Sequence, residues 1–327
     1  MDSRQWQEPV LSERFTSGLV SIIIPTRNRE ALLPATISSV RAQDYIDWEI
    51  VLVDDGSTDD TEALVRGLVP PERLQYIRGQ GLGAQGARNL GMAHCHGEFL
   101  QFLDSDDLLH HRKLSLQVAH LQTDLSLDFS ISSVIWTDHP ESKPTGPKVA
   151  APRPPLTVEN LRGAFCLTPA PLFRRAPLRN VGRWDEDLAF CHETNFYGRA
   201  LAHGLHSRYQ PDAIAYARTH PGRLCNDLTR LAALQNTIVA FERVRLVAES
   251  MGRAVHSQML WTIHNERANI AVVRRDKITA LRELRAALPY HSDEYGGPRR
   301  RLRMRQLLIK TLGIGFYRAW WLRNRAR

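Results

Sequence analysis

Four short apolar runs, separated by segments with helical spacing, constrain the fold of this chain more than any other feature. The runs are residues 19–24, 48–53, 74–77 and 98–103. Each has the length and composition of a buried strand. The segments between them repeat apolar residues three and four positions apart, as helices do. This alternation predicts an α/β fold with a mixed, mostly parallel sheet flanked by helices.

Polar residues stand directly after three of these runs. They are Pro25-Thr26 after the first run, Asp54-Asp55 after the second, and residues 104–107 after the fourth. The carboxyl ends of parallel strands meet at one edge of a sheet, and ligands bind there. We therefore expect a binding site built from these three segments.

The Asp-Ser-Asp triplet at residues 104–106 predicts a site for a divalent metal ion. Asp104 and Asp106 stand two residues apart after a buried run, so both carboxylates can converge on one cation. Oxygen ligands suit Mg²⁺ and Mn²⁺, which usually also bind phosphate oxygens of a substrate. The alternative is that these acids only cap the next helix, because short acidic triplets are common.

A glycine-rich segment offers a rival interpretation. Gly81 to Gly86 matches the G-x-G-x-x-G pattern of dinucleotide-binding folds, and a later strand ends in Asp104. However, the segment follows the third strand instead of opening the fold, and Asp104 belongs to an acidic cluster. Arg88 and Asn89 after the glycines suit a polar donor site. These observations count against a nicotinamide or flavin enzyme.

The positive charge of the chain is confined to its tail. Ten of the 43 Lys and Arg residues lie between Gly297 and Arg327, where no Asp or Glu occurs. The rest of the chain has 33 basic and 35 acidic residues, so it is slightly acidic. A protein that binds nucleic acid spreads positive charge over its main surface. We therefore expect no nucleic-acid partner.

Four segments in a fixed order resemble glycosyltransferase family 2. They are residues 21–29, 53–59, 86–91 and 97–107, and weaker similarity follows in residues 171–175 and 181–186. The resemblance implies a GT-A fold, which is a Rossmann-like nucleotide-diphospho-sugar transferase fold. It also implies inverting transfer of a sugar from a nucleotide-sugar, expected to be a UDP-sugar, to a hydroxyl of a glycan or lipid-linked acceptor.

The resemblance assigns binding roles to individual residues. Those expected to bind the donor nucleotide are Pro25, Thr26, Arg27, Asp55, Arg88 and Asp104. Asp104 and Asp106 are expected to bind the metal ion, Mn²⁺ or Mg²⁺. Arg218 and His220 match an Arg-x-His-Pro-Gly segment that can face the diphosphate. A structural role for His220, or a surface position for Arg218, is the alternative.

The expected catalytic base departs from the family pattern. The family usually has Glu-Asp before a helix, with the Asp as base, but Thr194 occupies that position here. A threonine hydroxyl is no base near neutral pH, so we expect Glu193 to act instead, with His192 as the alternative. Glu193 could also merely cap the helix. The chain would then be a catalytically weak protein that binds a sugar nucleotide or glycan.

The chain is expected to contain four parts. They are an N-terminal extension (1–18), a GT-A domain (19–225), a helical region (226–290), and a linker with a basic amphipathic tail (291–327). No signal peptide or membrane span is predicted, and four scattered cysteines fit a reducing compartment. We expect a cytoplasmic protein whose residues 299–327 dock on an anionic inner membrane surface. Packing of this tail on protein is the alternative.

Overall fold

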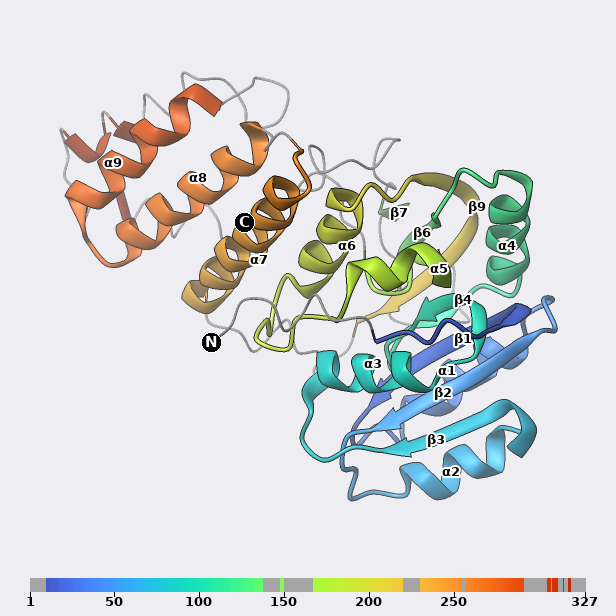
Figure 1. The fold of residues 1–327 in the computed structure, drawn as a ribbon. Coiled ribbons are helices and arrows are strands. Elements are labelled where there is room, and N and C mark those ends of the chain that lie inside the picture. The colour runs from blue at the N-terminus through green and yellow to red at the C-terminus, as the bar shows by residue number, and fades with distance from the viewer. Residues whose placement is uncertain are drawn as a thin grey trace. The chain divides into compact units, whose positions relative to one another are not determined.

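The chain divides into two compact units in the computed structural model. The first contains Met1–Leu156, Ala164–Asp187 and His203–Arg223, and the second contains Thr157–Gly163, Leu188–Ala202 and Leu224–Arg327. The structure describes residues 10–137, 148–149, 167–219, 230–253, 257–290, 305–306, 308–310, 314 and 317–318. Figure 1 labels the helices and strands of both units.

One mixed sheet organises the described part of the first unit. Its strands are β1 (Thr16–Thr26), β2 (Trp48–Asp54), β3 (Leu74–Arg78), β4 (Gly97–Phe102), β5 (Leu108–Leu109), β6 (Phe129–Thr137), β7 (Lys148–Val149), β8 (Pro171–Arg174) and β9 (Ser207–Arg218). They lie in the order β3-β2-β1-β4-β8-β6-β9-β5, with β7 paired to β6. Strands β3, β2, β1 and β4 are parallel, and β8 runs antiparallel to β4 and β6. The predicted α/β sheet is confirmed.

The register of the parallel strands brings the predicted site segments to one edge. Thr26 pairs with Asp54 at the ends of β1 and β2. Beyond the paired residues, the Asp55 amide donates to the Thr26 carbonyl at 2.8 Å, and the Leu103 amide donates to the Ile23 carbonyl at 3.0 Å. The apolar runs are therefore buried in the sheet while the polar segments emerge together at their carboxyl ends.

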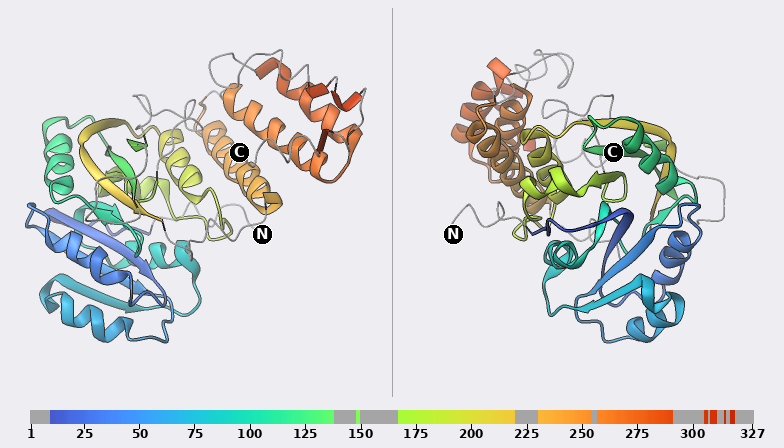
Figure 2. Two further views of the ribbon diagram at one scale, coloured as in Figure 1. Left: turned by 180° about the vertical axis from the view of Figure 1, so that it is seen from behind. Right: turned by 45° about the vertical axis from the view of Figure 1, so that its right-hand side comes forward.

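Helices cover both faces of the parallel strands. The helices of this unit are α1 (Leu33–Arg41), α2 (Thr61–Leu68), α3 (Gly83–His94), α4 (Lys113–Thr123) and α5 (Arg175–Leu178), with 3-10 turns at Pro71–Arg73 and Arg179–Val181. Helix α3 crosses β1 and β2 on one face, and α1 and α2 lie together on the other (Figures 1 and 2). Gly91 permits this close approach, because a Cβ there would stand 2.5 Å from Ile23 Cγ2.

Aromatic side chains form the core beneath β4, β6 and β8. Phe173 stacks on Phe129 with ring centroids 5.0 Å apart, and Phe102 contacts Trp184 edge-to-face, also at 5.0 Å. All four rings are almost completely buried. The cluster therefore anchors the segment around Trp184 to the strand that leads into the acidic triplet.

The described part of the second unit is helical. It contains α6 (His192–Ala202), α7 (Arg230–Ser250), α8 (Ser257–Val273) and α9 (Lys277–Ala287), followed by a 3-10 turn at Leu288–Tyr290. Helix α7 packs on α6 and α8, and α8 packs on α9. The compact units therefore differ from the predicted division, because α6 groups with the C-terminal helices. None of the described helices has both the length and the apolar character needed to span a membrane.

Residues of the basic tail contribute to the helical core. Ile309 and Tyr317 are buried in one cluster with residues of α8 and α9, including Val272 and Leu284. Arg305 donates to Tyr317 Oη and to the side-chain oxygens of two asparagines on α8, each at 2.6 Å. Packing on protein, the alternative reading of the tail, therefore holds for these residues. The predicted linker, 291–298, lies outside the described residues.

Candidate active site

Three carboxylates form a cluster immediately after β4. They belong to Asp104, Asp106 and Asp107, and one oxygen of each lies within 4.8 Å of the others. Asp107 is fully buried, whereas the Asp104 side chain is 27% exposed, so the cluster can be reached from outside. Three converging oxygens fit a hard divalent cation such as Mg²⁺ or Mn²⁺. The assignment of Asp104 and Asp106 to a metal stays a prediction. Asp107 was missed, although it continues the same acidic run.

Arg88 pairs with the first acid of the cluster. Its Nη2 lies 2.5 Å from Asp104 Oδ1, and its side chain is only 3% exposed. The guanidinium also stacks over the Trp184 ring, with 4.9 Å between Cζ and the ring centroid. This contact fixes the guanidinium plane, so Arg88 holds one Asp104 oxygen in place. The structure thus links the predicted donor residue Arg88 to the predicted metal ligand Asp104.

Asn89 fixes the tryptophan on which Arg88 stacks. Its side-chain amide donates to the Trp184 carbonyl at 2.9 Å and to Glu186 Oε1 at 2.8 Å, and its Oδ1 accepts the Trp184 amide at 2.7 Å. Asn89 itself is buried. Trp184 and Glu186 received no role from the sequence. Both lie in residues 181–186, and the weak family resemblance of this segment could have pointed to them.

Asp55 caps the glycine-rich turn. Its carboxylate accepts the Leu82 amide at 2.6 Å and the Gly83 amide at 2.8 Å, at the start of α3. Gly81 and Gly83 both have φ of +71°, a conformation that favours glycine. Two of the three glycines of the G-x-G-x-x-G pattern therefore have a structural reason that requires no dinucleotide. The predicted contact of Asp55 with a nucleotide base stays a prediction.

The loop after β1 is fastened to the loop after β2. Asn28, at φ of +52°, donates its amide to Ser57 Oγ at 2.9 Å, and its Oδ1 accepts the Thr58 amide at 2.8 Å. This places Pro25, Thr26 and Arg27 beside Asp55. The Thr26 hydroxyl is buried and has no hydrogen-bond partner within the part of the chain that the structure describes. A ligand entering here can satisfy it.

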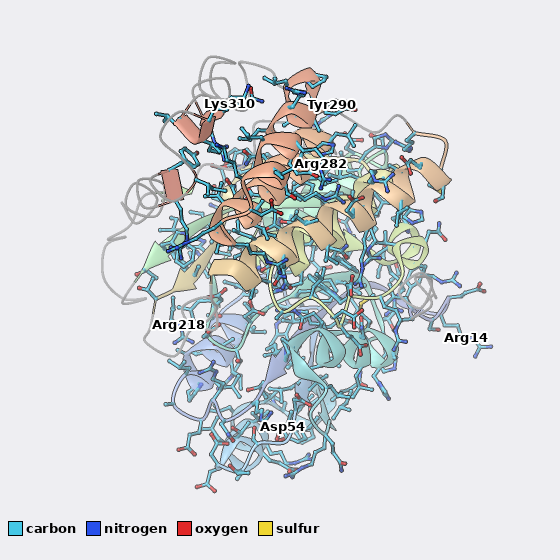
Figure 3. The ribbon with its side chains drawn as sticks, turned by 90° about the vertical axis from the view of Figure 1, so that its left-hand side faces the viewer. Arg14, Asp54, Arg218, Arg282, Tyr290 and Lys310 are labelled. Atoms are coloured by element: carbon cyan, nitrogen blue, oxygen red, sulfur yellow. The ribbon has the colours of Figure 1, made fainter. Side chains whose placement is uncertain are left out.

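Arg218 reaches the acidic cluster from the end of β9. Its backbone amide donates to Asp107 Oδ1 at 3.1 Å, and its Nε donates to the Asp106 carbonyl. Burial lowers the pKa of the Arg218 guanidinium, and the charges of Asp106 and Asp107 oppose this shift. Figure 3 labels Arg218 and, at the end of β2, Asp54. Whether Arg218 faces a diphosphate stays a prediction, and His220 lies outside the described residues.

The predicted catalytic base lies in the second unit, in the first turn of α6. Glu193 Oε2 and His192 Nε2 are 3.3 Å apart, and both side chains are about one-fifth exposed. Cys191 precedes them at φ of +59°. Burial raises the pKa of the Cys191 thiol to about 11, so it is protonated at neutral pH. Among the residues at this helix start, Glu193 and His192 are the groups suited to accept a proton. Their catalytic role stays a prediction.

Comparison with known proteins identifies relatives of the first unit. Residues 21–182 match the model of glycosyl transferase family 2. An uncharacterized glycosyltransferase of Rickettsia bellii is 39% identical over 103 residues, covering 32% of this chain and 15% of that protein. The GalNAc(5)-diNAcBac-PP-undecaprenol beta-1,3-glucosyltransferase of Campylobacter jejuni is 42% identical over 93 residues, covering 28% of this chain and 30% of that protein. In Escherichia coli, the UDP-Glc:alpha-D-GlcNAc-diphosphoundecaprenol beta-1,3-glucosyltransferase WfgD is 40% identical over 102 residues, covering 31% and 40%. The chain thus spans less than half the length of these curated relatives.

Solved structures resemble a larger part of the chain. Residues 1–349 of S. aureus TarS, in complex with UDP-GlcNAc, superpose with a TM-score of 0.68 at 20% identity, covering 91% of this chain and 89% of that one. The mannosyltransferase PcManGT from Pyrobaculum calidifontis, in complex with GDP-Man and Mn²⁺, gives a TM-score of 0.53 at 18% identity, covering 97% and 88%. The predicted GT-A fold is confirmed by this likeness.

Proposed function

Because the sheet domain of this chain belongs to glycosyltransferase family 2, we propose that the protein transfers a sugar from a nucleotide-sugar to an acceptor hydroxyl. The donor we propose is a UDP-sugar, and the acceptor a glycan or lipid-linked glycan. The cluster of Asp104, Asp106 and Asp107 beside buried Arg88 carries the proposal. The TarS neighbour was solved with UDP-GlcNAc, and two relatives are named for undecaprenol-linked substrates.

Each group of site residues has a proposed task. The acidic cluster would hold Mn²⁺ or Mg²⁺, which supplies Lewis-acid stabilisation for the leaving diphosphate. Asp55 with Pro25, Thr26 and Arg27 would bind the nucleotide base, and Arg88 would orient Asp104. Glu193 would accept the proton of the attacking hydroxyl, which must approach opposite the leaving group for the configuration to invert.

A donor panel tests the transferase proposal. The protein is incubated with UDP-sugars or GDP-sugars and Mn²⁺, and the released nucleoside diphosphate is measured. Asp106→Asn should lower turnover by roughly 10²–10³-fold, the size of several kcal/mol in the barrier. Asp212→Asn, which removes an exposed carboxylate outside the site, is the matched control. Full turnover in Asp106→Asn, or in excess EDTA, would refute the metal role.

Thr194 motivates a second candidate function, a binding protein of the same fold with little turnover. Glu193→Gln separates the two, because it removes the proposed base and keeps the shape of the side chain. An active parent silenced by this change supports catalysis. A parent that binds UDP in calorimetry but turns over no donor supports the binding protein.

We further propose that the protein works at the inner face of a membrane, where a lipid-linked acceptor would lie. Lys310 is exposed, while Ile309 and Tyr317 are buried in the helical core. The contact would therefore rely on basic residues of 299–327 and not on these two apolar ones. Flotation with anionic vesicles tests this membrane contact, and a full chain that stays unbound would refute it.

A further inference from the structure

Arg218 and Thr36 fasten the acidic loop to the first turn of α1. The Thr36 hydroxyl donates to the Ser105 carbonyl at 2.8 Å, and Arg218 Nε donates to the Asp106 carbonyl. The Arg218 backbone amide donates to Asp107 Oδ1 at 3.1 Å. Each of the three consecutive residues 105–107 thus receives a hydrogen bond from this pair. The loop is held by directed bonds to its backbone as well as by its own turn.

The same guanidinium also reaches the segment that leads out of the predicted nucleotide-binding loop. Arg218 Nη2 donates to the Leu32 carbonyl at 2.9 Å and to Thr36 Oγ1 at 3.0 Å. The Leu32 amide in turn donates to the Arg29 carbonyl at 3.0 Å. One buried side chain therefore connects the acidic loop with the end of the loop after β1.

We propose that Arg218 is a positioning residue, which sets the spacing of the carboxylates of Asp104, Asp106 and Asp107 for a divalent cation. The proposal rests on the proposed function of this cluster. The planar guanidinium donates in fixed directions, so lysine cannot reproduce its bonds to Asp106, Leu32 and Thr36 together. Groups that orient metal ligands contribute strongly to metal affinity even though they do not touch the metal.

Arg175 provides a matched control at the opposite end of the same sheet. It is also buried, more deeply than Arg218, and its guanidinium also donates to backbone carbonyls, those of Gly97 at 2.7 Å and Cys95 at 2.6 Å. These partners flank the start of β4, whereas the acidic loop follows its end. Loss of Arg175 should therefore cost comparable hydrogen bonding without disturbing the carboxylate cluster.

The test compares Arg218→Gln with Arg175→Gln in the full chain. Mn²⁺ alone is titrated by calorimetry, and hydrogen exchange is followed in the peptide spanning 103–109. Arg218→Gln should raise the Kd for Mn²⁺ by about 10–100-fold, the usual effect of losing a group that orients metal ligands, and should speed exchange in this peptide. Arg175→Gln should leave both unchanged within about twofold. In turnover assays, saturating Mn²⁺ should restore most of the kcat of Arg218→Gln.

Two further readouts keep the proposal open to refutation. Thr36→Val removes the hydroxyl that donates to Ser105 and accepts from Arg218, but it keeps the bonds of Arg218 to Asp106, Asp107 and Leu32. It should therefore shift the Kd in the same direction by a smaller factor even where Arg218→Gln fails to fold. An unchanged Kd in both variants, equal loosening by Arg175→Gln, or a wild-type protein that binds no Mn²⁺ would each overturn the proposal. A wild type that binds Mn²⁺ but transfers no sugar counts against the proposed function, while the Kd and exchange comparison still decides the role of Arg218.

Discussion

The two ends of β4 bury the same kinds of side chain and use them differently. At the amino end, the Glu49 carboxylate accepts bonds from Ser21 Oγ and the His96 amide at 2.6 Å, and from Gln75 Nε2 at 2.9 Å. At the carboxyl end, three carboxylates gather within 4.8 Å, and Arg88 binds one of them.

This difference separates a structural polar cluster from a candidate site. Glu49 is a single carboxylate bonded by donors from its own protein, at the end of the sheet opposite the proposed ligand site, so it serves stability. Carboxylates gathered in one place repel one another, and a bound divalent cation offsets this repulsion. We therefore expect substitutions at the amino end to change the free energy of unfolding, and substitutions at the carboxyl end to change turnover.

The largest effect is expected for Arg88→Met at the carboxyl end. This change leaves Asp104 without its buried cationic partner, so kcat/KM should fall by roughly 10²–10³-fold. Arg66→Met, in an exposed i,i+4 pair with Glu62 on α2, should leave kcat/KM unchanged. Steady-state assays with the active donor give both values. A fully active Arg88→Met protein would break the contrast between the two ends.

The next largest effect is expected for Gly97→Ala at the amino end. A Cβ at this position would stand 2.6 Å from both the Leu19 carbonyl oxygen and the Ser21 amide nitrogen, which are backbone atoms of β1. The free energy of unfolding should therefore fall by about 2–4 kcal/mol, while the folded fraction keeps its kcat. Urea unfolding measures the loss.

Gly67→Ala is the matched control for Gly97→Ala. Gly67 lies in α2 with open space around its Cα, so alanine there should stabilise the protein by about 0.5–1 kcal/mol. If both substitutions changed the free energy of unfolding equally, the backbone of β1 would have to shift to make room for the new Cβ. The amino end would then be less rigid than its contacts indicate.

The smallest effect, and the most diagnostic in its pH dependence, is expected for Glu49→Gln. Burial alone would raise the pKa of Glu49, but the hydrogen bonds from Ser21, His96 and Gln75 outweigh it, so the pKa lies below the ordinary 4.5. The charged carboxylate therefore stabilises the fold above pH 4.5, and this contribution is lost as the pH falls through the lowered pKa.

The Glu49→Gln variant should accordingly be less stable than the wild type by about 1–2 kcal/mol at neutral pH. The difference should shrink below pH 4.5 as the wild-type carboxyl is protonated. Thermal unfolding across this pH range measures it. A difference that stays constant with pH would mean that the charge of Glu49 plays no part.

Local pattern was enough to predict the strands that carry the site. Strands β1 to β4 were recognised because each is a continuous apolar run ended by polar residues, and their parallel pairing follows from the helices between them. The same logic placed Asp55 and Asp104 at one edge. The strands and the residues at their ends depend on neighbours in the sequence, so they can be predicted from the sequence alone.

Contacts between distant residues could not be predicted in this way. Arg218 binds Leu32 and Thr36, which lie more than 180 residues away in the sequence, and no periodicity in the sequence predicts such a contact. The predicted GT-A domain (19–225) included helix α6, which the compact units group with the C-terminal helices, because a helical pattern does not say which neighbour the helix packs on. The mixture of arginine and apolar residues in the tail favoured a membrane surface, although Ile309 and Tyr317 are buried in the helical core.

The cap that Asp55 provides for α3 bears on how tightly a donor is held. Because two backbone amides already fix its carboxylate, the side chain is preorganised before any ligand enters. A side chain immobilised only on binding costs about 0.5–1.5 kcal/mol of affinity, and a base bound in the proposed way would be spared this loss. In the proposed mode of binding, the glycine turn would also keep Asp55 from moving to follow a differently shaped base.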